Sequence, residues 1–325
     1  MPLFLALFAL SAAPRGGDVG PLVRALWLVQ RYGTADATDP ANDRRVKAAL
    51  ARAIAKDKVI TLQEIAPFMA PETFKSLSGS DDSLDASEIA QAVEAAVPES
   101  RAKLAPSLKS HADYLTTTFD LIDEAHREAG ASLARWIAAN YAPGKPLRVT
   151  VVCTGNSRRS ILGSSMGNLA AAYCGLPEVR FHSGGTAPTA FNVRTVAALK
   201  EVGFRVEPTG SEAPRGEPQT ANPIYRVSWG EGLEATEFSK HYADPSNPQG
   251  DFAALMVCSE ADAGCPFVKG ATLRVSMPYL DPKIYDDGAY ESAKYAERRD
   301  DIGRLMLSAM MQARRELAAK QMARP

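Results

Sequence analysis

One short segment of the chain combines a cysteine, an arginine and a serine at a spacing suited to oxyanion chemistry. It reads Cys153-Thr-Gly-Asn-Ser-Arg-Arg159-Ser160. A cysteine thiolate is a strong nucleophile, and the planar guanidinium of Arg159 can donate two parallel hydrogen bonds to a tetrahedral oxyanion. The same positive charge favours the thiolate form of Cys153, and Ser160 can donate its hydroxyl to the sulfur. The segment therefore predicts a thiolate nucleophile beside a bound oxyanion.

The other residues of this loop can supply backbone groups for the anion. Gly155 allows a tight turn, and Asn156 can brace the loop with its side chain. Successive backbone N–H groups and a helix amino terminus converge on an anion when such a loop joins a strand to a helix. The predicted oxyanion-binding residues are Thr154, Gly155, Asn156, Ser157, Arg158, Arg159 and Ser160. The alternative is a buried cysteine at a strand end, followed by a polar helix cap.

The elements that position this loop alternate between strands and helices. Apolar and β-branched runs predict strands, and apolar residues at helical spacing predict helices. The predicted strands are 147–152, 179–183, 252–257 and 271–276, and the predicted helices are 160–174, 193–200 and 291–320. Such alternation predicts an α/β domain over 147–320, with three layers and a central, mostly parallel sheet flanked by helices. Residues 207–250 are rich in Pro, Gly, Ser and Asn, with one strand-like run, and are interpreted as a surface insertion.

The first half of the chain has a different character. Residues 18–146 are Ala-rich, show helical spacing without a clear alternating strand, and predict a small all-α domain. Within it, segments 57–65 and 81–89 recur 24 residues apart and are similar to the second halves of EF-hand loops. With Glu64 or Glu88 as the closing ligand, Ala53 or Leu77 falls where the first carboxylate should be. Helix caps and solvated charge therefore explain the repeat better than calcium does.

A second pair of thiols follows the predicted strand 252–257. Cys258 and Cys265 are seven positions apart on an expected mobile loop at the carboxyl edge of the sheet, where α/β folds build their sites. Thiol–disulfide exchange needs an approachable thiolate, which a flexible loop over 261–264 would allow. Alternatively, Cys258 is a core residue and Cys265 is incidental. Metal binding is disfavoured because this spacing is not that of structural zinc, and His182 and His241 form no matching pair.

Together these segments resemble the low-molecular-weight protein tyrosine phosphatases and the thioredoxin-coupled arsenate reductases of the same fold. The resemblance covers about 147–313 and is greatest to bacterial arsenate-reductase-like protein tyrosine phosphatases. It is carried by Asn156-Ser-Arg-Arg-Ser160, Ser183-Gly-Gly-Thr-Ala-Pro-Thr-Ala-Phe-Asn192, Asn222-Pro-Ile-Tyr225 and Phe238-Ser-Lys240. The amino-terminal half has no such match.

The resemblance implies roles for the thiols. Cys153 would attack the oxyanion, Cys258 would attack the arsenylated Cys153 and release arsenite, and Cys265 would then resolve the disulfide. Reduced thioredoxin or another dithiol would be the electron donor, with no bound cofactor. The interval between Cys153 and Cys258 is longer than in the compact reductases, and the surplus falls in 207–250.

The resemblance also implies a general acid. Asp281, in Tyr279-Leu-Asp281-Pro282, occupies the place of the acid that protonates the leaving oxygen. A turn-forming Asp before Pro is the alternative, and Asp286 and Asp287 are nearby competitors without a following Pro. Tyr279 and Tyr285 could mimic the aromatic pair that tyrosine phosphatases place near the acid.

Three functions remain open at this point. The first is thiol-dependent reduction of arsenate. The second is a phosphatase that forms a phosphocysteine, with the second thiol pair protecting Cys153 by reversible oxidation. The third is a non-catalytic oxyanion or redox sensor. Arsenate and phosphate share their geometry, so the loop alone does not choose between the first two.

The composition and the amino-terminal segment bear on the class of partner and on the cellular location. The chain of 325 residues has a formal net charge of -1 and no long basic run, which disfavours nucleic acid as a partner and favours a small oxyanion. No apolar run reaches the ~20 residues that a membrane span needs. Residues 1–17 contain a short apolar stretch that slightly favours a signal peptide and export to the periplasm, although no Lys or Arg precedes it. An amino-terminal helix of a cytoplasmic protein is the alternative.

Overall fold

The computed structural model describes most of the chain from residue 98 onward and a few short segments before it. The described residues are 59–65, 75, 78, 81–85, 98–116, 118–216, 219–265 and 267–322. The predicted signal peptide or helix at 1–17 lies outside them, as does most of the segment 18–97. Among the described residues, no helix combines the length and apolarity needed to cross a membrane.

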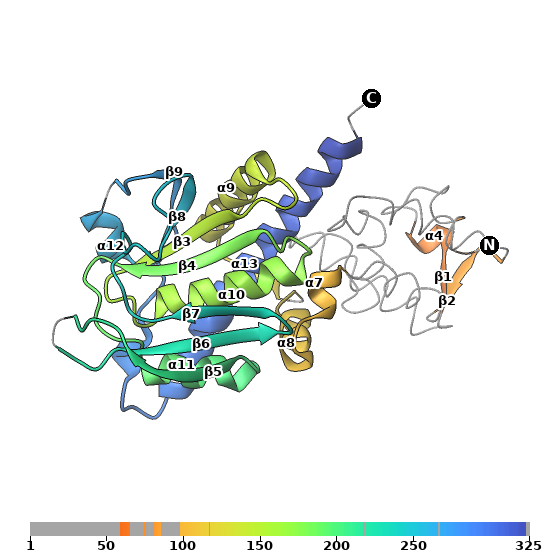
Figure 1. Cartoon of the computed structure of the whole chain (residues 1–325). Helices are drawn as coiled ribbons and strands as arrows, with labels where there is room; N and C mark the ends of the chain where they lie inside the picture. The colour runs from red at the N-terminus through yellow and green to blue at the C-terminus, as the bar shows by residue number, and fades with distance from the viewer. Residues whose placement is uncertain are drawn as a thin grey trace.

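A four-stranded parallel sheet forms the centre of the α/β region (Figure 1). Its strand order is β4-β3-β8-β9, with β3 (Leu147–Cys153), β4 (Val179–Gly185), β8 (Phe252–Met256) and β9 (Ala271–Ser276). All five residues of β8 are buried, as expected for a parallel strand covered on both faces. The predicted α/β class, with a parallel sheet flanked by helices, is confirmed.

The chain changes direction across the sheet between β3 and β8. From β3 it passes through α10 (Arg159–Tyr173) to β4 on one side, and it later returns to place β8 on the other side. The register pairs Val152 with Met256, so β3 and β8 end at the same level. Cys153 therefore lies at the topological switch point, where open α/β sheets bind ligands.

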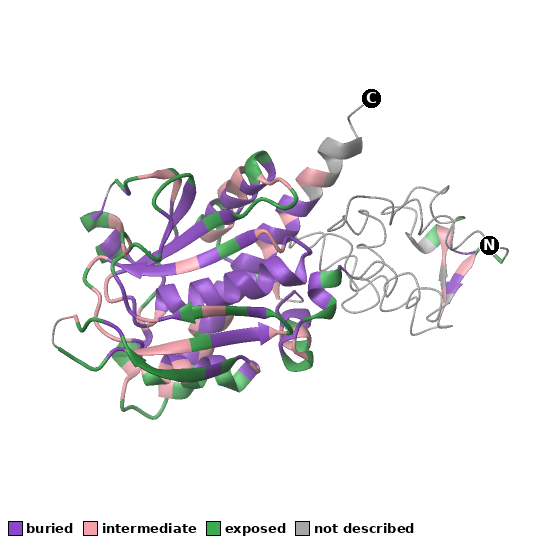
Figure 2. Ribbon diagram, viewed as in Figure 1, coloured by how far each residue is buried: buried purple, intermediate pink, exposed green. Residues whose placement is uncertain are grey.

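Helix α10 is buried along its whole length (Figure 2). A Cβ atom added at Gly163 or Gly167 would come within 2.7 Å of Val151 or 2.4 Å of Phe181, so these glycines let the helix lie close to the sheet. On its other side, the Ser164 hydroxyl donates to Glu237 of β7 over 2.9 Å. The helix that carries Arg159 is therefore held between two sheets.

The second sheet corrects an expectation. Residues 207–250 were expected to be a loop-rich surface insertion with one strand-like run at 224–229. Instead, β5 (Arg205–Glu212), β6 (Pro223–Gly230) and β7 (Leu233–Glu237) form an antiparallel sheet of order β5-β6-β7, in which β6 contains that run. The residues of β5 after Val206 are exposed and include Pro and Gly, which hid the strand pattern. Val227 and Trp229 of β6 are buried in the common core.

The helices before residue 146 belong to the same core. They are α7 (Glu99–Ala102), α8 (Pro106–Thr116), the 3-10 turn η1 (Phe119–Leu121) and α9 (Glu124–Asn140). Gly130 of α9 packs against Leu305 of the closing helix α13 (Glu291–Met322). Their buried residues join those of the α/β region in one cluster, so the expected boundary at 146 does not separate two cores. Amphipathic spacing in a helix indicates which of its faces is buried, but it does not indicate which element packs against that face.

The 24-residue repeat forms a small antiparallel pair. β1 (Val59–Thr61) precedes the one-turn helix α4 (Leu62–Ile65), and β2 (Ser83–Asp85) lies in the second repeat. Ile60 pairs with Leu84, which occupies the equivalent position of its repeat. Contrary to the all-helical expectation, this region contains strands. Ala53, Leu77 and Glu88 lie outside the described residues.

Candidate active site

The carboxyl edge of the parallel sheet gathers the predicted functional residues. Cys153 ends β3 and pairs with Gly185 at the end of β4, while Cys258 follows β8. The segment after β9 joins them because the Tyr279 amide donates to the Val257 carbonyl over 3.1 Å. Strand register thus brings the loop, the second thiol pair and the Asp281 segment to one edge.

The neighbouring segment 186–192 fixes the loop after Cys153. The carbonyls of Cys153, Thr154, Gly155 and Ser157 accept hydrogen bonds from the backbone amides of 186, 187, 189 and 192 at 2.9 to 3.2 Å. In a trans peptide the N–H points opposite to its C=O. The amides that follow these carbonyls therefore face away from that segment, which is the arrangement that an anion-binding loop requires.

Asn156 is the strained residue of the loop. Its φ is 42°, in the left-handed region that Asn tolerates better than most residues, so the turn expected at Gly155 lies one residue later. Its side chain donates to Ser160 Oγ over 2.9 Å and accepts from the Lys240 amide over 2.8 Å. Ser160 Oγ lies 3.1 Å from Cys153 Sγ. Because Asn156 already donates to that oxygen, the Ser160 hydroxyl is free to donate to the sulfur.

Arg159 connects the loop to the Asp281 segment. Its two terminal nitrogens donate to the Tyr279 carbonyl over 2.9 Å and to Asp281 Oδ2 over 2.6 Å. The Arg159 side chain is buried, and within the described part of the chain its Nε has no hydrogen-bond partner. Asp281 is 30% exposed, so it faces both the guanidinium and solvent.

The side chain of Arg158, the residue before Arg159, is directed to other partners than Asp281. Arg158 donates to Tyr295 Oη over 2.6 Å and to Asp286 over 2.9 Å. Burial raises the pKa of the Tyr295 phenol, which therefore stays neutral between the two charges. Arg158 was predicted to bind the oxyanion, but this geometry leaves only its backbone for that role. Asp286 is engaged here and Asp287 pairs with Arg194, so of the three acids it is Asp281 that meets Arg159.

Cys258 lies directly against the loop. Its sulfur is fully buried, 3.4 Å from Thr154 Oγ1, and accepts the amide of Ala261 over 3.4 Å as the cap of helix α12 (Ser259–Gly264). The expected mobile loop over 261–264 is therefore a short helix. A capping thiol stabilises that helix because it satisfies an amide that has no partner within the helix.

Cys265 lies at the other end of α12. Its thiol donates to the Phe267 carbonyl over 3.3 Å and is hydrogen-bonded to the side chain of Tyr242. That bond with Cys265, together with burial, raises the pKa of Tyr242. Cys153, Cys258 and Cys265 are free thiols.

Two segments that carried the resemblance without an assigned role prove to support the loop. Ser239 donates to the Gly155 carbonyl over 3.0 Å, and Asn222 is hydrogen-bonded to the Ser239 backbone through both ends of its amide. The Lys240 amide holds Asn156 as described above. The shared sequences around 222 and 238–240 were the only available signal for these contacts, because the residues lie far from the loop in sequence.

Tyr279 does not line the mouth of the site. It is 6% exposed, its ring stacks on His126 of α9 with centroids 4.3 Å apart, and burial raises the pKa of its phenol. Tyr279 thus lies close to Asp281 in sequence, as suggested for one member of an aromatic pair near the acid, but its ring packs against α9.

The arrangement can hold a small oxyanion beside a nucleophilic sulfur. Among the described residues, no group of three or more His, Cys, Asp or Glu side chains could hold a metal ion. No protein-family model and no curated protein matches this chain, so no family is assigned to it by comparison.

Proposed function

We propose that the protein reduces arsenate to arsenite with the thiols of Cys153, Cys258 and Cys265. The observation that supports this most directly is the position of Cys258, whose sulfur lies 3.4 Å from the side chain of the residue after Cys153. In a phosphatase a second thiol there would only protect Cys153 by reversible oxidation, whereas in a reductase it takes part in every turnover. The chemistry balances without a bound cofactor because two thiols supply the two electrons that As(V) accepts.

The reaction begins when the Cys153 thiolate attacks arsenic and displaces an oxygen that leaves as water after protonation. The loop amides and the free Nε of Arg159 hold the remaining oxygens. Asp281, whose two oxygens accept from Arg159 and from the Lys283 amide, takes a proton from solvent and passes it to the leaving oxygen. The Cys258 thiolate then attacks Cys153 Sγ. The S–As bond breaks, its electron pair leaves with arsenic as arsenite, and a Cys153–Cys258 disulfide remains.

The last step transfers the disulfide away from the nucleophile. The Cys265 thiolate attacks Cys258, which frees Cys153 as a thiolate, and an external dithiol such as reduced thioredoxin reduces the Cys258–Cys265 bond. At ~1.5 Å per helical residue, α12 separates the two Cα atoms by roughly 10 Å. A disulfide needs them within about 7 Å. Helix α12 must therefore unwind for this step.

Replacement of Cys258 by alanine tests the proposed relay. We expect arsenate reduction with a dithiol donor to fall by at least roughly 100-fold, on the scale of losses for essential groups. Hydrolysis of 4-nitrophenyl phosphate by the same variant should persist, because its first step needs only Cys153. Cys174→Ala is the matched control, since Cys174 is also buried but caps the far end of α10. Unchanged arsenite release by Cys258→Ala would contradict the proposal.

Replacement of Gly264 by alanine tests the unwinding of α12. A Cβ there has open space, and alanine favours a helix by ~1 kcal/mol relative to glycine. We expect steady-state arsenate reduction to slow by about two- to fivefold, which corresponds to that energy, while the single-turnover burst of arsenite is unchanged. Gly250→Ala, also in open space but outside the helices, should alter neither rate. Equal rates for wild type and Gly264→Ala would argue against unwinding as a slow step.

A phosphatase is the second candidate, and the position of Asp281 favours it. Its carboxyl group touches Arg159 and is partly exposed, so after protonation from solvent it could donate that proton to the ester oxygen as Cys153 forms a phosphocysteine. Water would then hydrolyse the intermediate. Turnover of aryl phosphates without arsenite formation would select this function over the reductase.

A further inference from the structure

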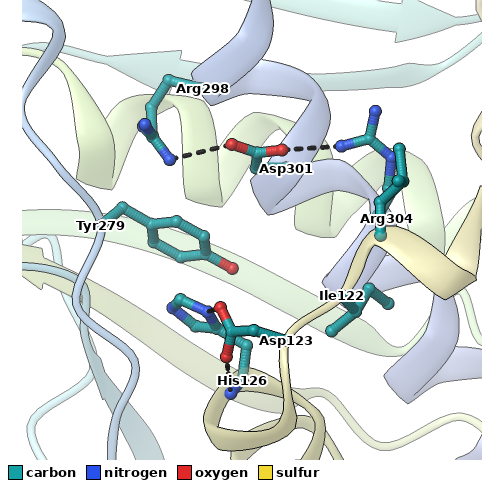
Figure 3. A pocket seen from close by; sticks show the side chains of 8 residues that line it. Ile122, Asp123, His126, Tyr279, Arg298, Asp301 and Arg304 are labelled. Carbon is teal, nitrogen blue, oxygen red and sulfur yellow. Dashed lines mark hydrogen bonds and ion pairs between the residues drawn. The ribbon is translucent and has the colours of Figure 1, made fainter.

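The first turn of α9 touches the segment that carries Asp281. The helix is capped by Asp123, whose side chain accepts the amide of His126 over 2.9 Å and pairs with His126 Nδ1. His126 Nε2 lies 3.1 Å from the Pro278 carbonyl oxygen, and the ring stacks on Tyr279 at an interplanar angle of 12°. Figure 3 shows the Tyr279 ring beside His126 and Asp123, which come from an element more than 150 residues earlier in the chain.

The partners of His126 define its hydrogen bonds. The Pro278 carbonyl can only accept a hydrogen bond. Burial raises the pKa of Asp123, but the hydrogen bonds from the amide and ring of His126 outweigh it and lower that pKa overall, so the carboxylate also accepts only. In this geometry both imidazole nitrogens face hydrogen-bond acceptors. His126 thus joins the helix cap to the backbone of the Asp281 segment by two hydrogen bonds.

The opposite side of the Tyr279 ring is enclosed by α13. Arg298 lies over the ring, 5.6 Å from its centroid. Asp301 accepts from Arg298 over 2.9 Å and from Arg304 over 2.7 Å, so its charge is balanced within the helix (Figure 3). The Tyr279 hydroxyl is buried and has no partner within the described part of the chain. The side chain is therefore held by its ring faces and not by its hydroxyl.

The backbone of Tyr279 faces the active site. Its carbonyl accepts from Arg159, and Asp281, two residues later, receives the other terminal nitrogen of the same guanidinium. In the described part of the chain, side-chain hydrogen bonds to the backbone of 278–280 come from Arg159 on this side and His126 on the other. Leu280 and Ile284 on the outer side are 57% and 64% exposed, whereas the Tyr279 side chain is buried and its amide donates to the Val257 carbonyl.

We infer that His126 is a positioning residue that holds the Asp281 segment in register with Arg159. The inference rests on the proposed function, because it assigns His126 a role through the acid. His126 contacts neither Cys153 nor the loop that follows it in the described structure. Its effect on turnover must therefore pass through Pro278 and Tyr279 to Asp281.

His126→Phe isolates the hydrogen bonds from the stacking. Phenylalanine keeps a ring against Tyr279 but removes both donors. The matched control is His111→Phe, because His111 also joins the early helices to a carboxylate, Asp300 of α13, over 2.9 Å. The two imidazole side chains are similarly enclosed, at 16% and 14% exposure, but His111 does not contact the Asp281 segment.

Hydrogen exchange of the full-length chain measures the position of the segment directly. We expect the amides of 279–281 and 283–286 to exchange about fivefold faster in His126→Phe, the change expected for loss of the one hydrogen bond from His126 to this segment, ~1 kcal/mol. The same amides should be unaffected in His111→Phe. Exchange in His126→Phe that equals the control overturns the inference, and this result does not depend on any activity.

Leaving-group dependence measures the consequence for the acid. Phenoxide leaves less readily than 4-nitrophenoxide and depends more on proton donation. We expect His126→Phe to lower kcat for phenyl phosphate several-fold more than for 4-nitrophenyl phosphate, with KM nearly constant. Asp281→Ala should show the same preference more strongly, and the double variant should lose no more than Asp281→Ala alone.

The outcomes separate the two proposals. If Asp281→Ala shows the preference and His126→Phe does not, the inference about His126 is overturned while the cysteine chemistry stands. If the wild type turns over neither arsenate nor aryl phosphates, the proposed function is wrong. The exchange measurement then still decides whether His126 holds the segment.

Discussion

Replacement of Cys153 by serine should abolish turnover of arsenate and of aryl phosphates, with kcat lower by roughly 10⁴-fold or more, the scale seen when a nucleophile is removed. Serine is close in size and can keep the contact with Ser160, so the loop should survive. A hydroxyl ionises far less readily than a thiol, and the side-chain partner of Cys153 in the described structure is Ser160, which is not a general base. The measurement is kcat at saturating substrate, with arsenate and phosphate binding followed by calorimetry.

Phosphate binding by Cys153→Ser distinguishes loss of the nucleophile from loss of the loop structure. Cys153→Ser should bind phosphate within a few-fold of the wild type, because the amides and Arg159 are unchanged. Cys174→Ser provides the control, since Cys174 is also buried but lies at the opposite end of α10. A kcat for Cys153→Ser within tenfold of the wild type would mean that the sulfur is not the nucleophile.

Replacement of Arg159 by lysine should lower kcat/KM by roughly 10² to 10³, the range for removal of one preorganised oxyanion donor. Lysine retains the charge but not the planar fork. The native side chain already directs its terminal nitrogens to the Tyr279 carbonyl and Asp281 and leaves Nε without a partner in the described structure. A single ammonium cannot reproduce these three directions. Steady-state kinetics and inhibition by inorganic phosphate measure the loss.

Arg158→Lys is the informative comparison because it changes the adjacent residue in the same way. The Arg158 guanidinium is directed to Asp286 and Tyr295, so its loss should cost several-fold at most. Equal losses for the two variants would contradict the assignment of Arg159 as the anion-binding arginine.

The residues of this site that lie close together in the sequence could be predicted from the sequence. Cys153, Arg159 and Ser160 lie within eight residues, and a β-branched run before them and an apolar helical pattern after them predict the strand and the helix. The sheet's parallel order follows from alternating elements. These features depend on neighbours along the chain, so composition and spacing carry them.

Local sequence patterns were weaker in β5 and in α12 than in the other elements. The exposed, Pro- and Gly-containing β5 lacks the alternation that identifies a strand. The six residues of α12 follow a buried strand and include a glycine, which favoured a mobile loop. Both elements gain their form from packing: β5 pairs with β6, and the buried Cys258 sulfur caps α12. Neither partner could be identified from periodicity.

Only the tertiary structure shows which residues that are far apart in sequence come into contact. Thr154 meets Cys258 across 104 positions, Arg159 meets Asp281 across 122, and His126 meets Pro278 across 152. Amphipathic spacing in α9 fixes which face is buried, but burial by itself is non-directional and does not select the covering element. The sequence by itself predicted a cysteine in an anion-binding loop. The fold determined that α9 contacts the segment that carries Asp281 and that the Cys258 thiol lies against the residue after Cys153.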